Sequence, residues 1–405
     1  MATIMKRGES YRIRVSCGYD IYGKQVTQSK TWRPDPGMTP KQIEKELQRQ
    51  AVLFEEECSH GKITASVKFE TFAEQWFKEY AELNHRPTTL QRERQLSVRV
   101  YKALGHMKLD KITARDIQRF INSLAKNGAN MVNGKPLAYK SIRHHLSFIS
   151  TIFEYANKLD MISYNPCSKV TIPKNNENGK AESKEKKIYT KEQARELIKM
   201  LDEAPLTYRV YFMLSIFTGC RRGELLGLEW GDFDLDKMTV HICRTSNYTM
   251  AKGMFTDTTK TEKSKRIISI PPQAVELIKQ YKAERDDYIK QLGDKWNTTE
   301  RLFVSWDGHP MHSNTTYKWL KRECEKRNFP FYGLHTFRHL FASLEIEAGI
   351  DPTTIAAMLG HSTPQTTLST YSHYFQEAKV RASNVIVEAL LGDDKDQTKP
   401  EKTAV

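Results

Sequence analysis

An arginine beside two glycines is the first residue in the chain whose setting suggests chemistry. Arg221 lies in residues 218–230, where the run Thr-Gly-Cys-Arg-Arg-Gly-Glu leads from a turn into a helix. Free backbone N–H groups and the helix dipole favour an anion at a helix start, and a guanidinium strengthens that preference. The same spacing also allows an ordinary surface ion pair between Arg221 and Glu224. The segment predicts an anion-binding arginine, with the surface pair as the alternative.

A second segment, residues 334–342, combines two histidines with an arginine. His335, Arg338 and His339 share one face of a helix, because residues three and four apart lie one turn above each other. Two imidazoles four residues apart can also bind a metal ion, so a metal site is the alternative here. Arg338 between them would repel a cation, and no carboxylate joins the cluster. We therefore expect no metal at this helix.

A histidine and a tyrosine follow near the end of the chain. In residues 358–362, Gly360 ends a helix and places His361 just beyond it. Tyr371 comes ten residues after His361. Tyr374, three residues later, lies on a similar helical face. The spacing alone does not separate the two tyrosines.

The fifth segment is rich in lysine. Residues 259–270 are predicted to form a β-hairpin, with a polar turn followed by a strand at residues 266–270. The lysines in and near the turn are Lys252, Lys260, Lys263 and Lys265. A lysine in a turn is usually only solvated, so the residues themselves leave open which of them has a chemical role.

Together the five segments resemble, in order and spacing, the catalytic domain of the tyrosine recombinase (phage integrase) family. That family combines an arginine in Gly-x-Arg-x-x-Glu, a hairpin lysine, His-x-x-Arg-His, Leu-Gly-His and a tyrosine shortly after. The resemblance spans roughly residues 188–389. The preceding helical segment is similar to the family's core-site-binding domain. The N-terminal module resembles the arm-site-binding domain of integrases from phages and conjugative transposons.

The resemblance implies a role for each matching residue. The catalytic set would be Arg221, Lys260, His335, Arg338, His361 and Tyr371. The two arginines would clamp a DNA phosphate, and His335 and His361 would hydrogen-bond it. Tyr371 would be the nucleophile that forms a covalent 3′-phosphotyrosine. Lys260, in a Lys-Thr pair that matches the family's hairpin, would protonate the leaving 5′ oxygen, and His339 would be structural support.

The chemistry of these residue types agrees with those roles. In-line displacement at a phosphodiester builds negative charge on the non-bridging oxygens, and two bidentate guanidiniums can neutralise it without a metal. A phenolate is a good leaving group, so a tyrosine can hold the phosphate reversibly. Its ordinary pKa of about 10 means that it needs a cationic pocket or a base. Because bond energy is conserved, no ATP is required, and we expect neither a cofactor nor a metal.

The rest of the chain predicts a multidomain protein. We expect a small α+β arm-binding module at residues 1–64, an all-α core-binding domain at 65–172, a charged linker at 173–187, a mainly α catalytic domain with a small antiparallel β-sheet at 188–391, and a disordered tail at 392–405. In the first module, residues 11–17 and 24–32 alternate as strands do, and a helix begins at Thr39. The apolar stripe of that helix is predicted to contain Ile43, Leu47, Ala51 and Leu53.

Basic residues in the first two domains are candidate DNA contacts. In the sheet of the first module they are Arg12, Arg14, Lys24 and Lys30. An ordinary solvated strand face explains them equally well. In the helix at residues 138–156 the apolar residues Ile142, Leu146, Ile149 and Phe153 are predicted core. The basic residues Lys140, Arg143 and His144 lie elsewhere on this helix, where they can follow a DNA backbone.

Composition is compatible with a polyanionic partner. The 405 residues carry a formal net charge of +14, and each phosphate neutralised by Lys or Arg releases a condensed counterion. The six cysteines are scattered without a CxxC pair, so we expect reduced thiols in a cytoplasmic protein. No segment approaches the roughly 20 apolar residues that a membrane span requires.

The sequence therefore predicts an integrase that inserts and excises a mobile genetic element, of phage or conjugative-transposon type. Its partner would be double-stranded DNA at core and arm attachment sites. The resemblance implies a homotetramer on DNA with a Holliday-junction intermediate, and it allows an excisionase and a host DNA-bending protein. Two alternatives remain: a type IB topoisomerase, which uses the same phosphotyrosine chemistry, and a DNA-binding regulator without catalysis. The apparently complete catalytic set argues against the regulator.

Overall fold

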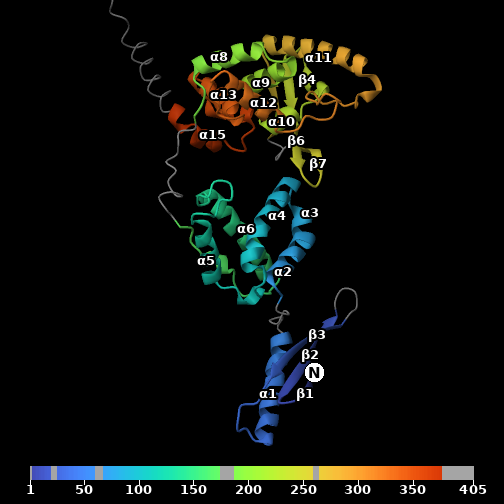
Figure 1. Ribbon diagram of the computed structural model, residues 1–405, viewed down its shortest axis with the longest axis vertical. Helices are drawn as coiled ribbons and strands as arrows, with labels where there is room; N and C mark the ends of the chain where they lie inside the picture. Colours follow the sequence, from blue (N-terminus) through green and yellow to red (C-terminus); the bar gives the residue numbers. More distant parts are fainter. Residues whose placement is uncertain (1, 20–24, 60–66, 174–186, 259–263, 376–405) are drawn as a thin grey trace, which may run out of the picture. The chain divides into compact units, whose positions relative to one another are not determined.

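The computed structural model describes residues 2–19, 25–59, 67–173, 187–258 and 264–375. The chain divides into two compact units, residues 1–183 and 184–405 (Figure 1). Lys24, Lys260, the predicted tail and almost all of the predicted linker lie outside the described residues. Within the first unit, the N-terminal module and the helical module that follows it have separate hydrophobic cores.

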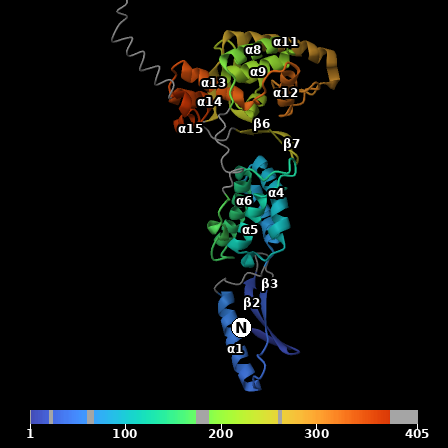
Figure 2. The ribbon, with the colours of Figure 1, turned by 60° about the vertical axis from the view of Figure 1, so that its left-hand side comes forward.

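The N-terminal module is a three-stranded antiparallel sheet with one helix packed against it (Figure 2). Its elements are β1 (Thr3–Arg7), β2 (Ser10–Tyr19), β3 (Gln25–Trp32) and α1 (Pro40–Ser59). β2 is the central strand, and side chains alternate between its two faces. Ile13 and Val15 are buried in the core between sheet and helix. Arg12 and Arg14, which alternate with these two residues along the strand, therefore face away from α1.

The apolar face of α1 differs in part from the prediction. Leu47 and Ala51 are buried as expected and Ile43 is half-buried, but Leu53 is 40% exposed and Phe54 is buried instead. Phe54 follows Ala51 by three residues and Leu47 by seven, which keeps all three on one side of a helix. Leu53 is turned away by one residue step of about 100°.

The helical module of the first unit contains no described strand. Its elements are α2 (Phe69–Trp76), the π-helical turn η1 (Phe77–Ala81), α3 (Glu82–Asn84), α4 (Pro87–Val100), the π-helical turn η2 (Tyr101–Gly105), the 3-10 turn η3 (Leu109–Lys111), α5 (Ala114–Leu124), α6 (Tyr139–Lys158) and the 3-10 turn η4 (Pro166–Lys169). Thr113 caps α5, where its hydroxyl accepts a hydrogen bond from the Asp116 N–H. In α6, Ile142, Ile149 and Phe153 are buried as predicted.

The second unit is mainly helical. Its helices are α8 (Lys191–Asp202), α9 (Leu206–Thr218), α10 (Arg222–Leu226), α11 (Pro272–Leu292), α12 (Thr315–Lys326), α13 (His335–Glu347), α14 (Pro352–Leu359) and α15 (Pro364–Thr370), with 3-10 turns η5 (Trp230–Asp232) and η7 (Gly293–Lys295). A large apolar core surrounds α9 and α11, and a smaller one joins α13 and α14 to Tyr371. The elements around this smaller core carry most of the predicted catalytic residues.

The strands of the second unit form two separate antiparallel groups. β4 (Phe233–Asp234), β5 (Thr239–Ile242) and β8 (Arg266–Ser269) make one sheet, and β6 (Arg244–Thr249) pairs with β7 (Gly253–Thr258). The lysine-rich segment was predicted to be the turn of a hairpin, but β8 pairs with β5 rather than with the preceding strand β7. This pairing sets Val240 opposite Ile268, and both side chains are buried in the main core.

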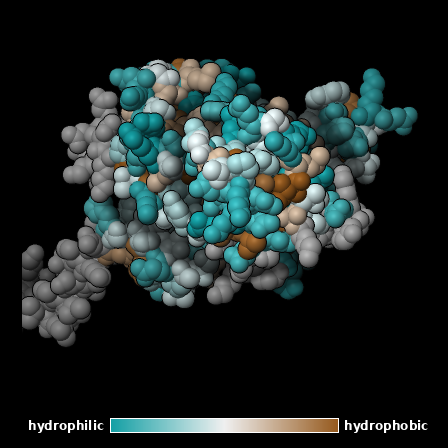
Figure 3. Space-filling model, turned by 90° about the horizontal axis from the view of Figure 1, so that it is seen from below, coloured by the Kyte–Doolittle hydropathy of each residue, from teal (hydrophilic) through white to brown (hydrophobic). Residues whose placement is uncertain are grey.

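Hydrophilic side chains cover most of the face seen in Figure 3, and apolar ones form small patches there. In the described part of the chain, no helix is both long and apolar enough to cross a membrane.

Candidate active site

Arg221 stands immediately before α10 and is tied to that helix by Glu224. The Arg221 N–H and guanidinium donate to the two carboxylate oxygens of Glu224 at 2.9 and 2.7 Å, and Nη2 donates to the Gly360 carbonyl at 3.2 Å. The Glu224 side chain is only 5% exposed, so the pair is not the ordinary surface ion pair that the sequence allowed. Glu224 thus holds the Arg221 guanidinium next to the segment that carries His361.

Arg266, the first residue of β8, is a buried cation that the sequence analysis missed. Its guanidinium donates to the Met358 and Ser264 carbonyls, to Cys220 Sγ and to Glu224 Oε2, the last at 2.9 Å. One side chain therefore connects β8, the start of α10 and the end of α14. A signal was present in the sequence, because Arg266 precedes Ile268 by two residues and therefore lies on the same, inward face of the strand.

The carboxylate between these arginines is ionised. Burial raises the pKa of Glu224, but Arg266 and Arg221 outweigh that effect and leave the pKa below its ordinary value. Removing either guanidinium would leave a buried carboxylate with one partner fewer.

Arg338 lies on α13 and is 2% exposed. Its Nη1 donates to the Gly219 carbonyl at 3.0 Å, while Nη2 is buried and has no hydrogen-bond partner among the described residues. Burial and the neighbouring Arg221 lower the pKa of Arg338 to about 10. Gly219 can turn its carbonyl toward Arg338 because it adopts a φ of +58°, and an added Cβ would lie 2.6 Å from the Phe341 ring.

His361 follows Gly360, the left-handed residue that ends α14. Its Nδ1 lies 2.7 Å from the Thr367 hydroxyl, which fixes the ring against α15. Burial and then the nearby guanidinium of Arg338 lower the pKa of His361 to about 4. The ring is therefore neutral at physiological pH.

Tyr371 and Tyr374, which the sequence spacing could not separate, lie in different surroundings. The Tyr371 hydroxyl is 2.9 Å from His339 Nδ1, and the side chain is 2% exposed. Burial raises the pKa of Tyr371 to about 12, although Arg338 acts in the opposite direction. Tyr374 lines another cavity, between α13 and residues 188–191. Tyr371 is thus the tyrosine whose hydroxyl lies beside His339.

His335 begins α13 and is exposed. Its ring meets the ring of His339 edge to face, with centroids 4.8 Å apart. The metal alternative would use both rings, but His339 Nδ1 faces the Tyr371 hydroxyl and Arg338 lies between the two residues on the helix. His335 also contributes to the lowered pKa of His361, so the two imidazoles share one neighbourhood.

The structure therefore gathers five of the six predicted catalytic residues. Arg221, His335, Arg338, His361 and Tyr371 come from α10, α13 and the ends of α14 and α15, and electrostatic or hydrogen-bond contacts connect them. Lys260, the sixth, lies outside the described residues. The sequence analysis did not assign a role to Glu224 or Arg266.

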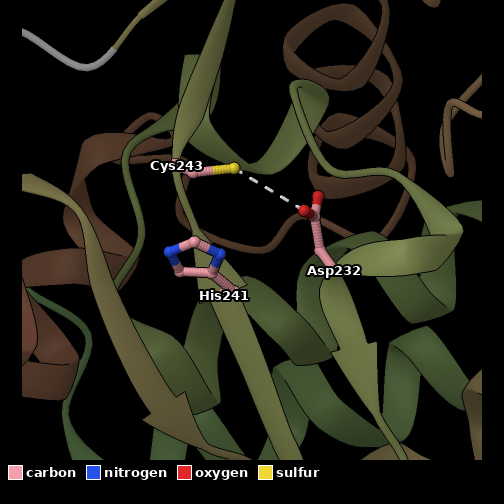
Figure 4. Close-up of side chains that lie close together, drawn as sticks. All are labelled: Asp232, His241 and Cys243. Atoms are coloured by element: carbon pink, nitrogen blue, oxygen red, sulfur yellow. Dashed lines mark hydrogen bonds between the residues drawn. The ribbon is translucent and has the colours of Figure 1, made fainter.

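Three side chains of metal-ligand type lie close together elsewhere in this unit. Asp232, His241 and Cys243 offer ligand atoms within 4.8 Å of one another (Figure 4). The carboxylate of Asp232 is already engaged: it accepts hydrogen bonds from the Glu229 N–H, Cys243 Sγ and the Arg244 guanidinium. The Arg244 guanidinium is thus already paired with this carboxylate.

The N-terminal sheet separates its predicted DNA contacts onto two faces. Arg12 and Arg14 point away from α1 and donate to the hydroxyls of Ser29 and Thr27 at 3.1 and 3.0 Å. Lys30 is opposite Ile13 in the strand register, so it lies on the helix side, where its ammonium is 5.8 Å from the Phe54 ring. The open face therefore contains the two arginines and a row of hydroxyls, without Lys30.

The predicted contacts on α6 have basic neighbours on α4. Lys140 and Arg143 are exposed and His144 is half-buried. Burial and then Arg92 of α4 lower the pKa of His144, which places that arginine close to the α6 cations. The sequence analysis did not single out Arg92, because its partner helix was not known.

Known protein families match both units. The family model described as "Phage integrase family" matches residues 187–378, and the one described as "Phage integrase, N-terminal SAM-like domain" matches residues 68–125. The ICEBs1 integrase of Bacillus subtilis (strain 168) is 26% identical over 369 residues, which cover 90% of this chain and 93% of that protein.

Two solved structures have the same fold. The Tn1549 transposon integrase in complex with a circular intermediate DNA has a TM-score of 0.62 at 19% identity and covers 79% of this chain and 100% of its own. A lambda integrase tetramer bound to a Holliday junction has a TM-score of 0.51 at 18% identity and covers 89% and 96%. These two structures show the fold. The family is shown by the two phage integrase family models and the integrase relative, together with the order of the motif residues: the chain belongs to the phage integrase family and is a tyrosine-type site-specific DNA recombinase.

Proposed function

We propose that this chain integrates and excises a mobile genetic element by exchanging DNA strands through a covalent bond between Tyr371 and a 3′-phosphate. The observation that carries the proposal is the position of Tyr371. Its hydroxyl is buried beside the same α13 residues that include Arg338, whose Nη2 has no partner among the described residues. A buried donor of this kind calls for an acceptor, and a phosphate oxygen is the one that suits a guanidinium.

The residues around Tyr371 support an in-line displacement. Arg221 and Arg338 are positioned before DNA binds, Arg221 by Glu224 and Arg338 by the Gly219 carbonyl, so their charge is available without reorganisation as negative charge develops on the phosphate. His361 is neutral and held by Thr367, so its other ring nitrogen can donate to the same phosphate. Lys260 remains our candidate for protonating the leaving 5′ oxygen.

The first unit supplies two candidate DNA-binding surfaces. The open face of the sheet, with Arg12 and Arg14 on its central strand, suits an arm-type attachment site. The cations of α4 and α6, which include Arg92, Lys140 and Arg143, suit the backbone of a core site. We leave Lys30 out of the first surface because it lies on the helix side of the sheet.

Assembly on DNA follows from the exchange reaction. Two duplexes must be cut and rejoined at once, and the similar lambda integrase is a tetramer on a Holliday junction. We propose the same assembly for this chain. An excisionase and a host DNA-bending protein are further proposed partners, which would set the direction of the reaction.

The test uses a nicked suicide duplex, in which the strand released by cleavage diffuses away. Because the attachment site is unknown, a duplex is first selected from a random-sequence pool by binding to the intact chain. We expect a covalent protein–DNA band on a denaturing gel from the intact chain and from Tyr374→Phe, and no such band from Tyr371→Phe.

Other outcomes discriminate among the alternatives. Loss of the band only with Tyr374→Phe would move the nucleophile. Relaxation of supercoiled DNA without exchange between two selected sites would favour a topoisomerase. Absence of any covalent species on DNA that the chain binds would favour a regulator without catalysis.

A further inference from the structure

His339 is the one member of the His-x-x-Arg-His motif to which the family resemblance gives only a supporting place. It lies on α13 directly after Arg338 and is 7% exposed. Its Nδ1 is 2.9 Å from the Tyr371 hydroxyl, and the two rings have centroids 5.5 Å apart at an interplanar angle of 66°. A hydrogen bond this short joins an imidazole nitrogen directly to the atom that would attack phosphorus.

The phenol of Tyr371 needs a proton acceptor at this place. Because burial raises the pKa of Tyr371 to about 12, very little phenolate forms near neutral pH without help. Arg338 lowers the cost of the negative charge, but a guanidinium cannot remove the proton. A base within hydrogen-bond reach of the hydroxyl can do so as the nucleophile attacks.

The other histidines of the site have different partners. His361 presents Nδ1 to the Thr367 hydroxyl at 2.7 Å and not to Tyr371. His335 is exposed at the start of α13, with its ring against the ring of His339. The three imidazoles therefore have different contacts, and His339 is the one in hydrogen-bond contact with Tyr371.

We infer that His339 is the base of the cleavage step, an inference that rests on the proposed function. The Tyr371 oxygen forms a bond to phosphorus and its proton passes to His339 Nδ1. The bond from phosphorus to the 5′ oxygen breaks, and that oxygen takes a proton from Lys260 or from water. In religation the 5′ hydroxyl gives its proton to Lys260 or to water as its oxygen bonds to phosphorus. The bond from phosphorus to the Tyr371 oxygen breaks, and His339 returns the proton to that oxygen. This role requires the tautomer of His339 with its proton on Nε2.

The experiment compares two suicide duplexes in single-turnover cleavage. One has an ordinary phosphodiester at the cleavage position, and the other has sulfur in place of the bridging 5′ oxygen. A thiolate leaves without protonation, so the sulfur duplex removes the need for an acid but keeps the need for a base. We expect His339→Gln, which can hydrogen-bond the hydroxyl but cannot take its proton, to cleave both duplexes about 100- to 1000-fold more slowly than the intact chain.

Chemical rescue separates a base from structural support. We expect added imidazole to restore cleavage by His339→Ala but not to change the cleavage rate of the matched variant His335→Ala. Only the first substitution opens space beside the Tyr371 hydroxyl. Thermal unfolding and DNA binding of each variant are measured alongside. If His339→Gln does not fold, the rescue of His339→Ala and the same comparison with His339→Asn decide the question.

Each contrary result has a distinct meaning. Three results would overturn the inference and leave the proposed function intact. They are full activity of His339→Gln, normal cleavage of the sulfur duplex alone by that variant, and rescue of His335→Ala in place of His339→Ala. A folded His339→Ala that imidazole does not rescue would make His339 structural support. Absence of covalent product from the intact chain would instead remove the proposed function.

Discussion

The second unit and the N-terminal sheet both contain arginines that enter the proposals above, but in opposite environments. Arg266 and Arg338 are buried beneath the site, and their donors meet carbonyls, a thiol and one carboxylate. Arg12 and Arg14 lie on an open sheet face and donate to neighbouring hydroxyls. The same residue type is thus held in a dry site in one region and presented to solvent in the other.

This difference shows how one protein can separate catalysis from attachment. Charges interact strongly where water is excluded, so a buried guanidinium acts strongly on charge that develops in a transition state. An exposed guanidinium strengthens DNA binding mainly because it releases counterions from DNA. This effect depends on salt concentration and not on the charge that develops during the reaction. Substitutions in the two regions should therefore change different measured quantities.

The largest effect is expected from Arg338→Met. Single-turnover cleavage of the suicide duplex should fall about 1000-fold, the size found when a transition-state donor is removed. The free energy of unfolding should change by only about 1 kcal/mol, because Glu224 keeps both of its guanidinium partners and the removal of a cation crowded by Arg221 offsets the donor that the Gly219 carbonyl loses. A large loss of stability in urea denaturation would show that Arg338 is structural.

Arg266→Met should change the stability of the fold more than Arg338→Met does. The substitution leaves Glu224 and the Met358 carbonyl without a buried donor, so we expect a loss of about 3 to 5 kcal/mol in the free energy of unfolding. The double variant Arg266→Met with Glu224→Gln should recover part of this loss, which a double-mutant cycle measures. Equal stability of the single variant and the intact chain would contradict the buried network.

A smaller effect is expected from pH. The pKa of His361 is about 4 in the folded chain, whereas an unfolded histidine titrates at about 6.5. Between these values the unfolded chain binds the additional proton, so this contribution to stability is complete above pH 6.5 and is lost as pH falls toward 4. After allowance for partial solvent exposure, we expect a loss of about 1 to 2 kcal/mol.

The matched variant His361→Asn isolates that contribution, since carboxylates titrate in both proteins. The free energy of unfolding of the intact chain should fall more steeply between pH 6.5 and pH 4 than that of the variant. Parallel curves would show that the histidine is not held in its neutral form.

The smallest effect on the reaction is expected from the double variant Arg12→Ala and Arg14→Ala. Binding to a selected arm-type duplex should weaken about tenfold at moderate salt, and the slope of log affinity against log salt should decrease by about 2. Cleavage of a duplex with only a core-type site should not change. Lys30→Ala is the matched control, because Lys30 lies on the other face of the sheet. An equal effect of this control would mean that the open face is not the DNA surface.

Local patterns predicted much of this fold. The strand β8, the helix end at Gly360 and most of the α6 core follow from spacing that needs only neighbouring residues. The prediction that Leu53 lies on the apolar face of α1 was wrong, because a difference of one residue on a helix rotates a side chain out of the core. The predicted hairpin was wrong because the pairing of a strand depends on which distant strand lies beside it in the core. For β8 that strand is β5.

By itself, the sequence determined the family and the types and order of the reactive side chains, since these are properties of the chain before it folds. Tertiary structure alone decided that Glu224 is buried between two guanidiniums, that Arg266 joins three elements, and that Tyr371 rather than Tyr374 meets His339. The reason is physical. Burial and long-range hydrogen bonds set the charge state and reactivity of these groups, and both arise only when segments distant in the chain exclude water together.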